Sequence, residues 1–351
     1  MRERRKTRKI NIGGVEIGGD APISVQSMCC TDTRDVKSTV AQIKKLEDAG
    51  CELIRVAIPD QQAASALAEI KKQIKIPIIA DIHFDYRLAL ESIANGADAL
   101  RLNPGNIGRR EFVEKVVKAA KERSIPIRIG VNAGSLQKGL SHAPDELANS
   151  LVESAMVHIR ILEELDFDLI KVSLKASDVA TMIDAYRKFS QMLDYPLHIG
   201  VTEAGTLKTG LIKSSIGIGS LLNEGIGDTI RVSLTEDPVE EVYAGWGILK
   251  SLNLRNRGLS LISCPTCGRC GIDLFSLAKR VEERFKNIKK PLTIAVMGCP
   301  VNGPGEARYA DIGVSGANGE GYIFKNGEIV ERLPYEMILE RLEQEVCALT
   351  S

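Results

Sequence analysis

Four cysteines in the last third of the sequence have a spacing that suits metal binding. Cys264 and Cys267 form a Cys-x-x-Cys pair, Cys270 extends the run by another such step, and Cys299 follows later, directly before Pro300. A pair of this kind lets two thiolates point at one centre, and a distant cysteine can close the site. Thiolates bind both zinc and iron–sulfur clusters. The spacing alone leaves a four-cysteine zinc site and an iron–sulfur cluster open.

A second set of polar residues recurs at the ends of short apolar runs. Its members are Arg55, Asp81, His83, Arg101, Asn103, Arg128, Asn132, Lys171, Lys175, Glu203, Arg231 and Ser233. Buried arginines and lysines need counter-charges. These charges could come from nearby acids in structural ion pairs, or from a polyanionic ligand, because guanidinium groups match phosphate oxygens in bidentate fashion.

The elements that must position this second set form a repeating pattern. Eight short apolar runs are expected to be strands: 24–28, 53–57, 78–82, 99–103, 127–131, 169–175, 197–201 and 229–234. Segments with helical periodicity lie between them, at 35–49, 61–72, 86–95, 109–121 and 178–190. Alternation of this kind predicts an α/β fold, a TIM (β/α)8 barrel over residues 1–252, with functional groups at the C-terminal ends of the strands. An open doubly wound sheet is the alternative, but its glycine-rich fingerprint is missing where Met28-Cys29-Cys30-Thr31 stands.

The two ends of the chain carry different patterns. Two short β runs flank Gly13-Gly14 and predict an N-terminal hairpin. Residues 253–351 predict a small α+β domain that carries the cysteines. Within it we expect a polar linker over 253–261, a helix near 272–285, a strand over 293–297, a hairpin around Asn326-Gly327 and a final helix near 335–347.

Longer motifs resemble a known family. The C-terminal combination of CPTC and GCPVNGPGE is similar to the cluster domain of the 4-hydroxy-3-methylbut-2-en-1-yl diphosphate synthases of the non-mevalonate isoprenoid pathway. The similarity extends through the barrel in VQSMCCTDT, ELIRVA, ADIHFD, LRLNPGN, IRIGVNAGS, KVSLKAS, HIGVTEAG and IRVSLTEDP. It therefore covers nearly the whole chain.

The resemblance implies a set of site residues. A [4Fe–4S] cluster would be held by Cys264, Cys267, Cys299 and Glu306, while Cys270 is a neighbour and not a ligand. The diphosphate clamp would consist of Arg55, Arg101, Arg128, Lys175, Arg231 and Ser233. Lys171 and Lys175 fall on the same side of one strand, and Lys175 is preferred because it is nearer the strand end. Asp81, Asn103, Asn132 and Glu203 would surround the carbon skeleton, with Glu203 delivering a proton.

The resemblance also implies a reaction and its partners. The expected activity is the reductive ring opening and dehydration of 2-C-methyl-D-erythritol 2,4-cyclodiphosphate to 4-hydroxy-3-methylbut-2-enyl diphosphate. Electrons would come from flavodoxin or ferredoxin. The family's arrangement is a head-to-tail homodimer, in which the cluster domain of one subunit caps the barrel of the other.

Composition disfavours some functions, and one alternative enzyme class stays open. Lysine plus arginine and aspartate plus glutamate both number 46, and aromatic residues make up 4%, so a nucleic-acid binder is not expected. No apolar run is long enough for a membrane helix, and the basic start MRERRKTRKI is not followed by a signal-type apolar region, so a cytoplasmic location is expected. The rival enzyme is a non-redox phosphate-ester lyase or aldolase barrel with a structural zinc tail.

Overall fold

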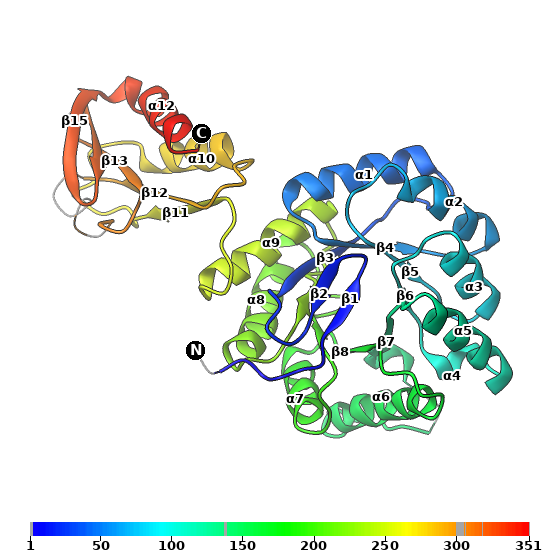
Figure 1. The fold of residues 1–351 in the computed structure, drawn as a ribbon. Helices are drawn as coiled ribbons and strands as arrows, with labels where there is room; N and C mark the ends of the chain where they lie inside the picture. The colour runs from blue at the N-terminus through cyan, green and yellow to red at the C-terminus, as the bar shows by residue number, and fades with distance from the viewer. Residues whose placement is uncertain (1–2, 137–138, 300–304, 306, 318, 351) are drawn as a thin grey trace. The chain divides into compact units, whose positions relative to one another are not determined.

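The chain divides into two compact units, which are described separately. They span Met1–Arg255 and Asn256–Ser351. The structure is a computed structural model that describes residues 3–136, 139–299, 305, 307–317 and 319–350. Figure 1 traces the first unit from blue to yellow and the second from yellow to red.

The first unit is an eight-stranded parallel barrel, as the sequence predicts. Hydrogen-bonded neighbours run in the order β8-β7-β6-β5-β4-β3-β10-β9, and a parallel bridge between Val172 and Leu197 joins the two ends. The strands are β3 Ser24–Met28, β4 Leu53–Ala57, β5 Ile78–Asp81, β6 Ala99–Arg101, β7 Ile127–Asn132, β8 Ile170–Lys175, β9 His198–Ile199 and β10 Thr229–Ile230. Because all of them are parallel, their C-terminal ends meet at one face, which we call the mouth.

Helices cover the outside of the barrel (Figure 1). They are α1 Val36–Ala49, α2 Gln61–Lys71, α3 Tyr86–Ala94, α4 Pro104–Ile107, α5 Arg110–Glu122, α6 Leu147–Glu163, α7 Val179–Ser190, α8 Leu207–Asn223 and α9 Pro238–Ser251. The first of them shows why they form: Asp35 caps its start by accepting from the Ser38 amide at 3.0 Å, and Gly50 ends it at φ 104°. Its apolar face, with Val40, Ile43 and Leu46, is buried in the barrel core.

An N-terminal hairpin closes the end of the barrel opposite the mouth. It consists of β1 Ile10–Ile12 and β2 Val15–Ile17, with positive φ at Gly13 and Gly14 in its turn. The isoleucines of this hairpin pack on three residues near the N-terminal ends of strands: Leu53, Ile79 and Ala99. Figure 1 shows the hairpin lying across the ring of strands. The barrel interior is therefore sealed with apolar side chains at this end.

The second unit contains a five-stranded mixed sheet with helices packed on it. Strands β11 Leu259–Ser263, β12 Leu292–Met297 and β13 Ile312–Ala317 are parallel, and β14 Glu320–Lys325 and β15 Glu328–Pro334 continue the sheet antiparallel. Helices α10 Leu274–Phe285 and α12 Ile338–Thr350 pack on its apolar core. The predicted hairpin is confirmed, and Asn326 and Gly327 both have positive φ, as a tight two-residue turn requires.

One sequence expectation in this unit is wrong. The segment 253–261 was expected to be a linker throughout, but Leu259 and Leu261 belong to β11, which pairs in parallel with β12. Both leucines pack against the second core, so burial outweighs the polar neighbours that made the segment look irregular. Strand β13 was not predicted, because its glycine-containing sequence IGVSGA carries a weak β pattern.

In the part of the chain that the structure describes, no helix is both long enough and apolar enough to cross a bilayer.

The barrel should depend on a buried carboxylate at the closed end. Asp228 is 1% exposed and accepts from the Arg4 guanidinium at 2.8 Å, the Thr7 hydroxyl at 3.1 Å and the Leu197 amide at 2.8 Å. Replacing Asp228 with alanine leaves these buried donors without their acceptor, and we expect it to lower the free energy of unfolding by about 3 kcal/mol. Urea unfolding followed by the fluorescence of Trp246, the single tryptophan, would measure this.

Asp194 provides a matched control. It pairs with Arg8 at 2.7 Å, but both side chains are about half exposed. An Asp194→Ala variant should unfold close to the unaltered protein. Equal losses in the two variants would contradict the role assigned to Asp228.

Candidate active site

Basic side chains from several strands converge inside the mouth. Arg55 comes from β4, Arg101 from β6, Arg128 from β7, Lys175 from β8 and Arg231 from the residue after β10. All are largely buried, and their charges act on one another. Burial is the main cause that lowers the pKa of Arg128, and the charges of Arg55 and Arg101 lower it further. Burial likewise lowers the pKa of Lys175 most, followed by the charges of Arg231, Arg128 and Arg55. The structure thus brings together the predicted basic residues.

A single carboxylate lies between two of these arginines. Asp81, at the end of β5, is 3.7 Å from Arg55 Nε and 3.4 Å from Arg101 Nη1. Burial acts to raise the pKa of Asp81, but hydrogen bonding to His83 and the charges of both arginines outweigh it and hold that pKa well below its usual range. Burial also lowers the pKa of Arg55 to about 10, against the attraction of Asp81. Asp81 therefore stays ionised and fixes both guanidinium groups.

A helix supplies the other carboxylate of the mouth. Glu241, on α9, is 4% exposed and pairs with Arg231 at 3.3 Å. It also accepts from the Ser27 hydroxyl at 3.2 Å and from the Leu234 amide at 3.0 Å. Glu241 is not among the residues predicted from the sequence, because it lies on a helix and not at the end of an apolar run. An acidic residue in the first turn of the helix after the last strand was the available signal.

Positive charge exceeds negative charge inside the mouth. The Arg128 Nη1 group donates to the Ser173 hydroxyl, but Nε and Nη2 of Arg128 are buried without a partner among the described residues. Asp81 and Glu241 are the acids paired with the arginines here, and neither forms an ion pair with Arg128 or Lys175. A buried excess of cations is costly unless an anion neutralises it. The arrangement is therefore suited to binding a polyanion.

Glycines make room for the basic side chains. A Cβ atom on Gly130 would lie 2.7 Å from Arg101 Nε, and one on Gly200 would lie 2.9 Å from Lys175 Nζ. The carbonyl of Gly130 also accepts from Arg101 Nη2 and from Asn103 Nδ2, each at 3.0 Å. Asn103 in turn accepts from the Gly130 amide at 2.9 Å, so its amide group is used to fix β7 beside β6.

The remaining predicted polar residues also lie at the mouth. Asn132 ends β7 and is half-buried, and Ser233 follows β10 and is half-buried. Glu203 follows β9, is exposed, and has φ 53°. A non-glycine residue with positive φ is strained, and such strain concentrates at functional positions. The backbone therefore singles out Glu203 among the acids of this face.

The cysteines lie at one edge of the second unit. Cys264 follows β11 and Cys299 follows shortly after β12, and these parallel strands are paired with Ser263 opposite Val296. The Gly298 amide donates to Cys264 Sγ at 3.3 Å, which places the two loops side by side. Hydrogen bonds from Arg269 lower the pKa of the exposed Cys267 and favour its thiolate.

Cys270 differs from the other cysteines of the run. Its thiol donates to the Ile272 carbonyl at 3.3 Å and lies 2.7 Å from where a Cβ on Gly298 would stand. Glu306 lies outside the described residues. Within the described ranges no group of three or more His, Cys, Asp or Glu residues is arranged as a metal site. The donor set still fits a soft-metal cluster, since Cys264, Cys267 and Cys299 are thiols on adjoining loops.

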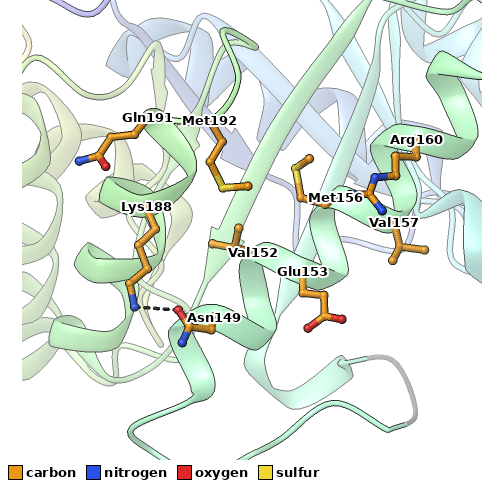
Figure 2. Close-up of a pocket in the computed structure, with 9 residues that line it drawn as sticks. All are labelled: Asn149, Val152, Glu153, Met156, Val157, Arg160, Lys188, Gln191 and Met192. Atoms are coloured by element: carbon orange, nitrogen blue, oxygen red, sulfur yellow. Dashed lines mark hydrogen bonds between the residues drawn. The ribbon is translucent and has the colours of Figure 1, made fainter.

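A pocket on the outside of the barrel is separate from these residues. Figure 2 shows it between α6 and α7, where the Lys188 ammonium donates to the Asn149 side chain. None of the predicted site residues lines it.

The fold and the mouth define a class of protein: a (β/α)8 barrel with a cation-rich mouth, followed by a separate domain that presents thiols. Comparison with known families makes the assignment specific. The GcpE TIM-barrel domain matches residues 7–246, and the GcpE protein C-terminal domain matches residues 260–348. The chain belongs to the GcpE family.

Relatives of high identity agree with this assignment. The chain is 60% identical to a protein of Geobacter sulfurreducens over 97% of both chains, and 58% identical to one of Dehalococcoides mccartyi over 99% of this chain and 100% of that one. Both are named 4-hydroxy-3-methylbut-2-en-1-yl diphosphate synthase (flavodoxin).

Solved structures of low identity share the barrel fold alone. Dihydropteroate synthase of Stenotrophomonas maltophilia aligns with a TM-score of 0.54 at 15% identity, covering 70% of this chain and 97% of that chain. A 3-dehydroquinate dehydratase of Geobacillus kaustophilus aligns with a TM-score of 0.50 at 16% identity, covering 71% and 98%.

The glycine next to Arg101 should control anion binding. In Gly130→Ala the new methyl group would displace the Arg101 guanidinium, and we expect the affinity for inorganic pyrophosphate to fall on the order of tenfold, or about 1.4 kcal/mol. Isothermal titration calorimetry measures this. Gly134→Ala, four residues on in open space, is the control and should bind normally. Unchanged binding by a folded Gly130→Ala protein would contradict the placement of Arg101.

Proposed function

We propose that this chain catalyses the reductive ring opening and dehydration of 2-C-methyl-D-erythritol 2,4-cyclodiphosphate to 4-hydroxy-3-methylbut-2-enyl diphosphate. The observation that carries the proposal is the cation-rich mouth, in a chain whose near full-length relatives bear the name of that enzyme. A cyclic diphosphate supplies the negative charge that the mouth lacks and many hydrogen-bond acceptors. The relatives' name also supports flavodoxin as electron donor; ferredoxin is the alternative carrier.

The basic residues act as the diphosphate clamp in this proposal. Arg128 and Lys175, which have no carboxylate partner in the described part of the chain, meet the anion directly. Arg55 and Arg101 are held in place by Asp81, and Arg231 by Glu241. Ser233 adds a hydroxyl donor at the end of the last strand. Because the guanidinium groups are fixed before the substrate arrives, binding orders few side chains.

The thiol edge of the second unit is assigned to a [4Fe–4S] cluster. Cys264, Cys267 and Cys299 would hold three irons, and Glu306 the fourth. When bound, such a cluster supplies electrons one at a time and a Lewis-acidic iron whose carboxylate ligand is more weakly held than a thiolate. The residues beside the clamp then orient the carbon skeleton: Asn132 from the end of β7, Asp81 and Asn103 from within the mouth.

Glu203 is the proposed proton donor for the departing hydroxyl. It is the exposed carboxylate at the mouth whose backbone is held in the left-handed region, just after β9. An exposed carboxyl group can exchange protons with solvent between turnovers, whereas Asp81 stays ionised between two arginines.

A head-to-tail dimer is proposed for bringing the mouth and the thiol edge together. Arg255, the last residue of the barrel unit, donates to the Ile23 carbonyl at 2.8 Å and pairs with Glu52 at 2.7 Å. Both partners stand just before strands, at the end opposite the mouth. The chain thus leaves the barrel far from its mouth. We propose that the cysteine-bearing domain of a second copy covers this mouth.

Substitution of the proposed proton donor tests the mechanism. Glu203→Gln should keep its affinity for the cyclic diphosphate but lose at least about a hundredfold in kcat, because the amide cannot supply the proton. Glu236→Gln alters another exposed carboxylate on the same face and should retain activity. Turnover assays with reduced flavodoxin, together with binding calorimetry, separate the two effects. Full activity of Glu203→Gln would contradict the assignment.

Metal analysis tests the cluster and its ligands. Anaerobically purified protein should contain about four irons and four acid-labile sulfides per chain, with little zinc. Cys264→Ser should lose most of this iron, whereas Cys270→Ser should keep it. Stoichiometric zinc without sulfide would instead indicate a non-redox barrel with a structural zinc site. In that case, substituting either cysteine should cause loss of the zinc.

A further inference from the structure

A lysine of the barrel interior is not used by the clamp. Lys171, on β8, is 2% exposed, and its Nζ has no hydrogen-bond partner among the described residues. Val172 and Leu174 belong to the apolar core cluster, so alternation along the strand sends Lys171, Ser173 and Lys175 to the opposite, inner side. Lys171 therefore lies two inward-facing positions below Lys175, deeper in the barrel than the mouth.

The surroundings of Lys171 offer little to a positive charge. On the side away from the mouth, the β1–β2 hairpin seals the barrel with isoleucines. On the neighbouring strand Arg128 stands directly opposite Lys171 in register. Both ring nitrogens of His198, on β9, are also buried without partners among the described residues.

The charges that act on this part of the barrel are mostly positive. By element, the titratable or charged groups are Arg55 on β4, Asp81 on β5, Arg101 on β6, Arg128 on β7, Lys175 on β8, His198 on β9, Asp228 and Arg231 around β10, Tyr186 on α7 and Glu241 on α9. Asp228 attracts Lys171, but its oxygens already accept from Arg4, Thr7 and the Leu197 amide. Burial, and then Arg128, lower the pKa of Lys171 to about 7.

We propose that Lys171 is a proton-linked positioning residue, neutral in the free protein at pH 8 and charged when a diphosphate occupies the mouth. The inference rests on the proposed function, because it needs an anion at the mouth. A bound polyanion reverses the local field, so the amine takes up a proton from solvent as the anion binds. The new ammonium group repels the Arg128 guanidinium toward the mouth and strengthens its contact with the anion.

The free protein provides the first test. A lysine with a lowered pKa in the folded state binds fewer protons than in the unfolded chain between about pH 7 and 10, so its contribution to stability rises with pH across this window. In full-length protein, the urea midpoint of Lys171→Met, read from Trp246 in α9, should exceed that of the unaltered protein at pH 7. The gap should close by pH 10.

An exposed lysine serves as the control for this test. Lys118→Met, at an exposed position on α5, should show no pH-dependent gap. A gap for Lys171→Met that does not change with pH would mean that Lys171 keeps its charge in the free protein, and the proposal would fail.

The second test counts protons during binding. Inorganic pyrophosphate is titrated into each protein at pH 8 in buffers of different ionisation enthalpy, which gives the number of protons taken up. The unaltered protein should take up more than Lys171→Met, by a difference approaching about one proton. If both proteins bind pyrophosphate and take up equal numbers of protons, the role proposed for Lys171 is overturned, but the anion site is not. An absence of pyrophosphate and substrate binding to the unaltered protein would overturn the proposed anion site as well.

Discussion

An uncompensated positive charge in the barrel mouth is the constraint on which the rest of this structure depends. Parallel strands direct their C-terminal ends to one face, and here Arg101 and Lys175 are strand-terminal residues. Three more arginines, Arg55, Arg128 and Arg231, lie within or just after strands and act electrostatically on Lys175. Bringing them together without a ligand costs free energy, and the fold limits that cost with two carboxylates, one from β5 and one from α9. Both carboxylates leave part of the charge free for an anion, which is the property that a diphosphate site needs.

Other local features follow from the same constraint. Gly130 and Gly200 leave space for long side chains in an interior that TIM barrels usually fill with branched apolar residues. The apolar filling is moved to the closed end, where the β1–β2 hairpin packs on strand residues. Apolar side chains thus close one end of the barrel, while the basic side chains are directed to the other.

The barrel could be predicted from the sequence, because alternating apolar runs and amphipathic segments are local patterns, whereas the roles given to its polar residues come from the family resemblance. Short apolar runs and amphipathic helices assign Arg55, Arg101 and Arg128 to the barrel strands without any knowledge of long-range contacts, although of these three Arg101 alone ends its strand. Glu241 could not be found in this way, since its role depends on a helix folding back over the last strand. The start of β11 was missed for a similar reason: Leu259 becomes a strand residue by pairing with Leu292, which is distant in sequence.

Among the described residues, the β1–β2 hairpin closes one end of the barrel, so a ligand reaches the basic side chains from the mouth. A barrel of this kind has no through-passage, since the hairpin's isoleucines occupy the far end. Whatever enters between the arginines must leave by the same route before the next molecule can enter. Product release must therefore precede the binding of the next substrate molecule. Any partner that covers the mouth during the reaction also limits the rate of this exchange.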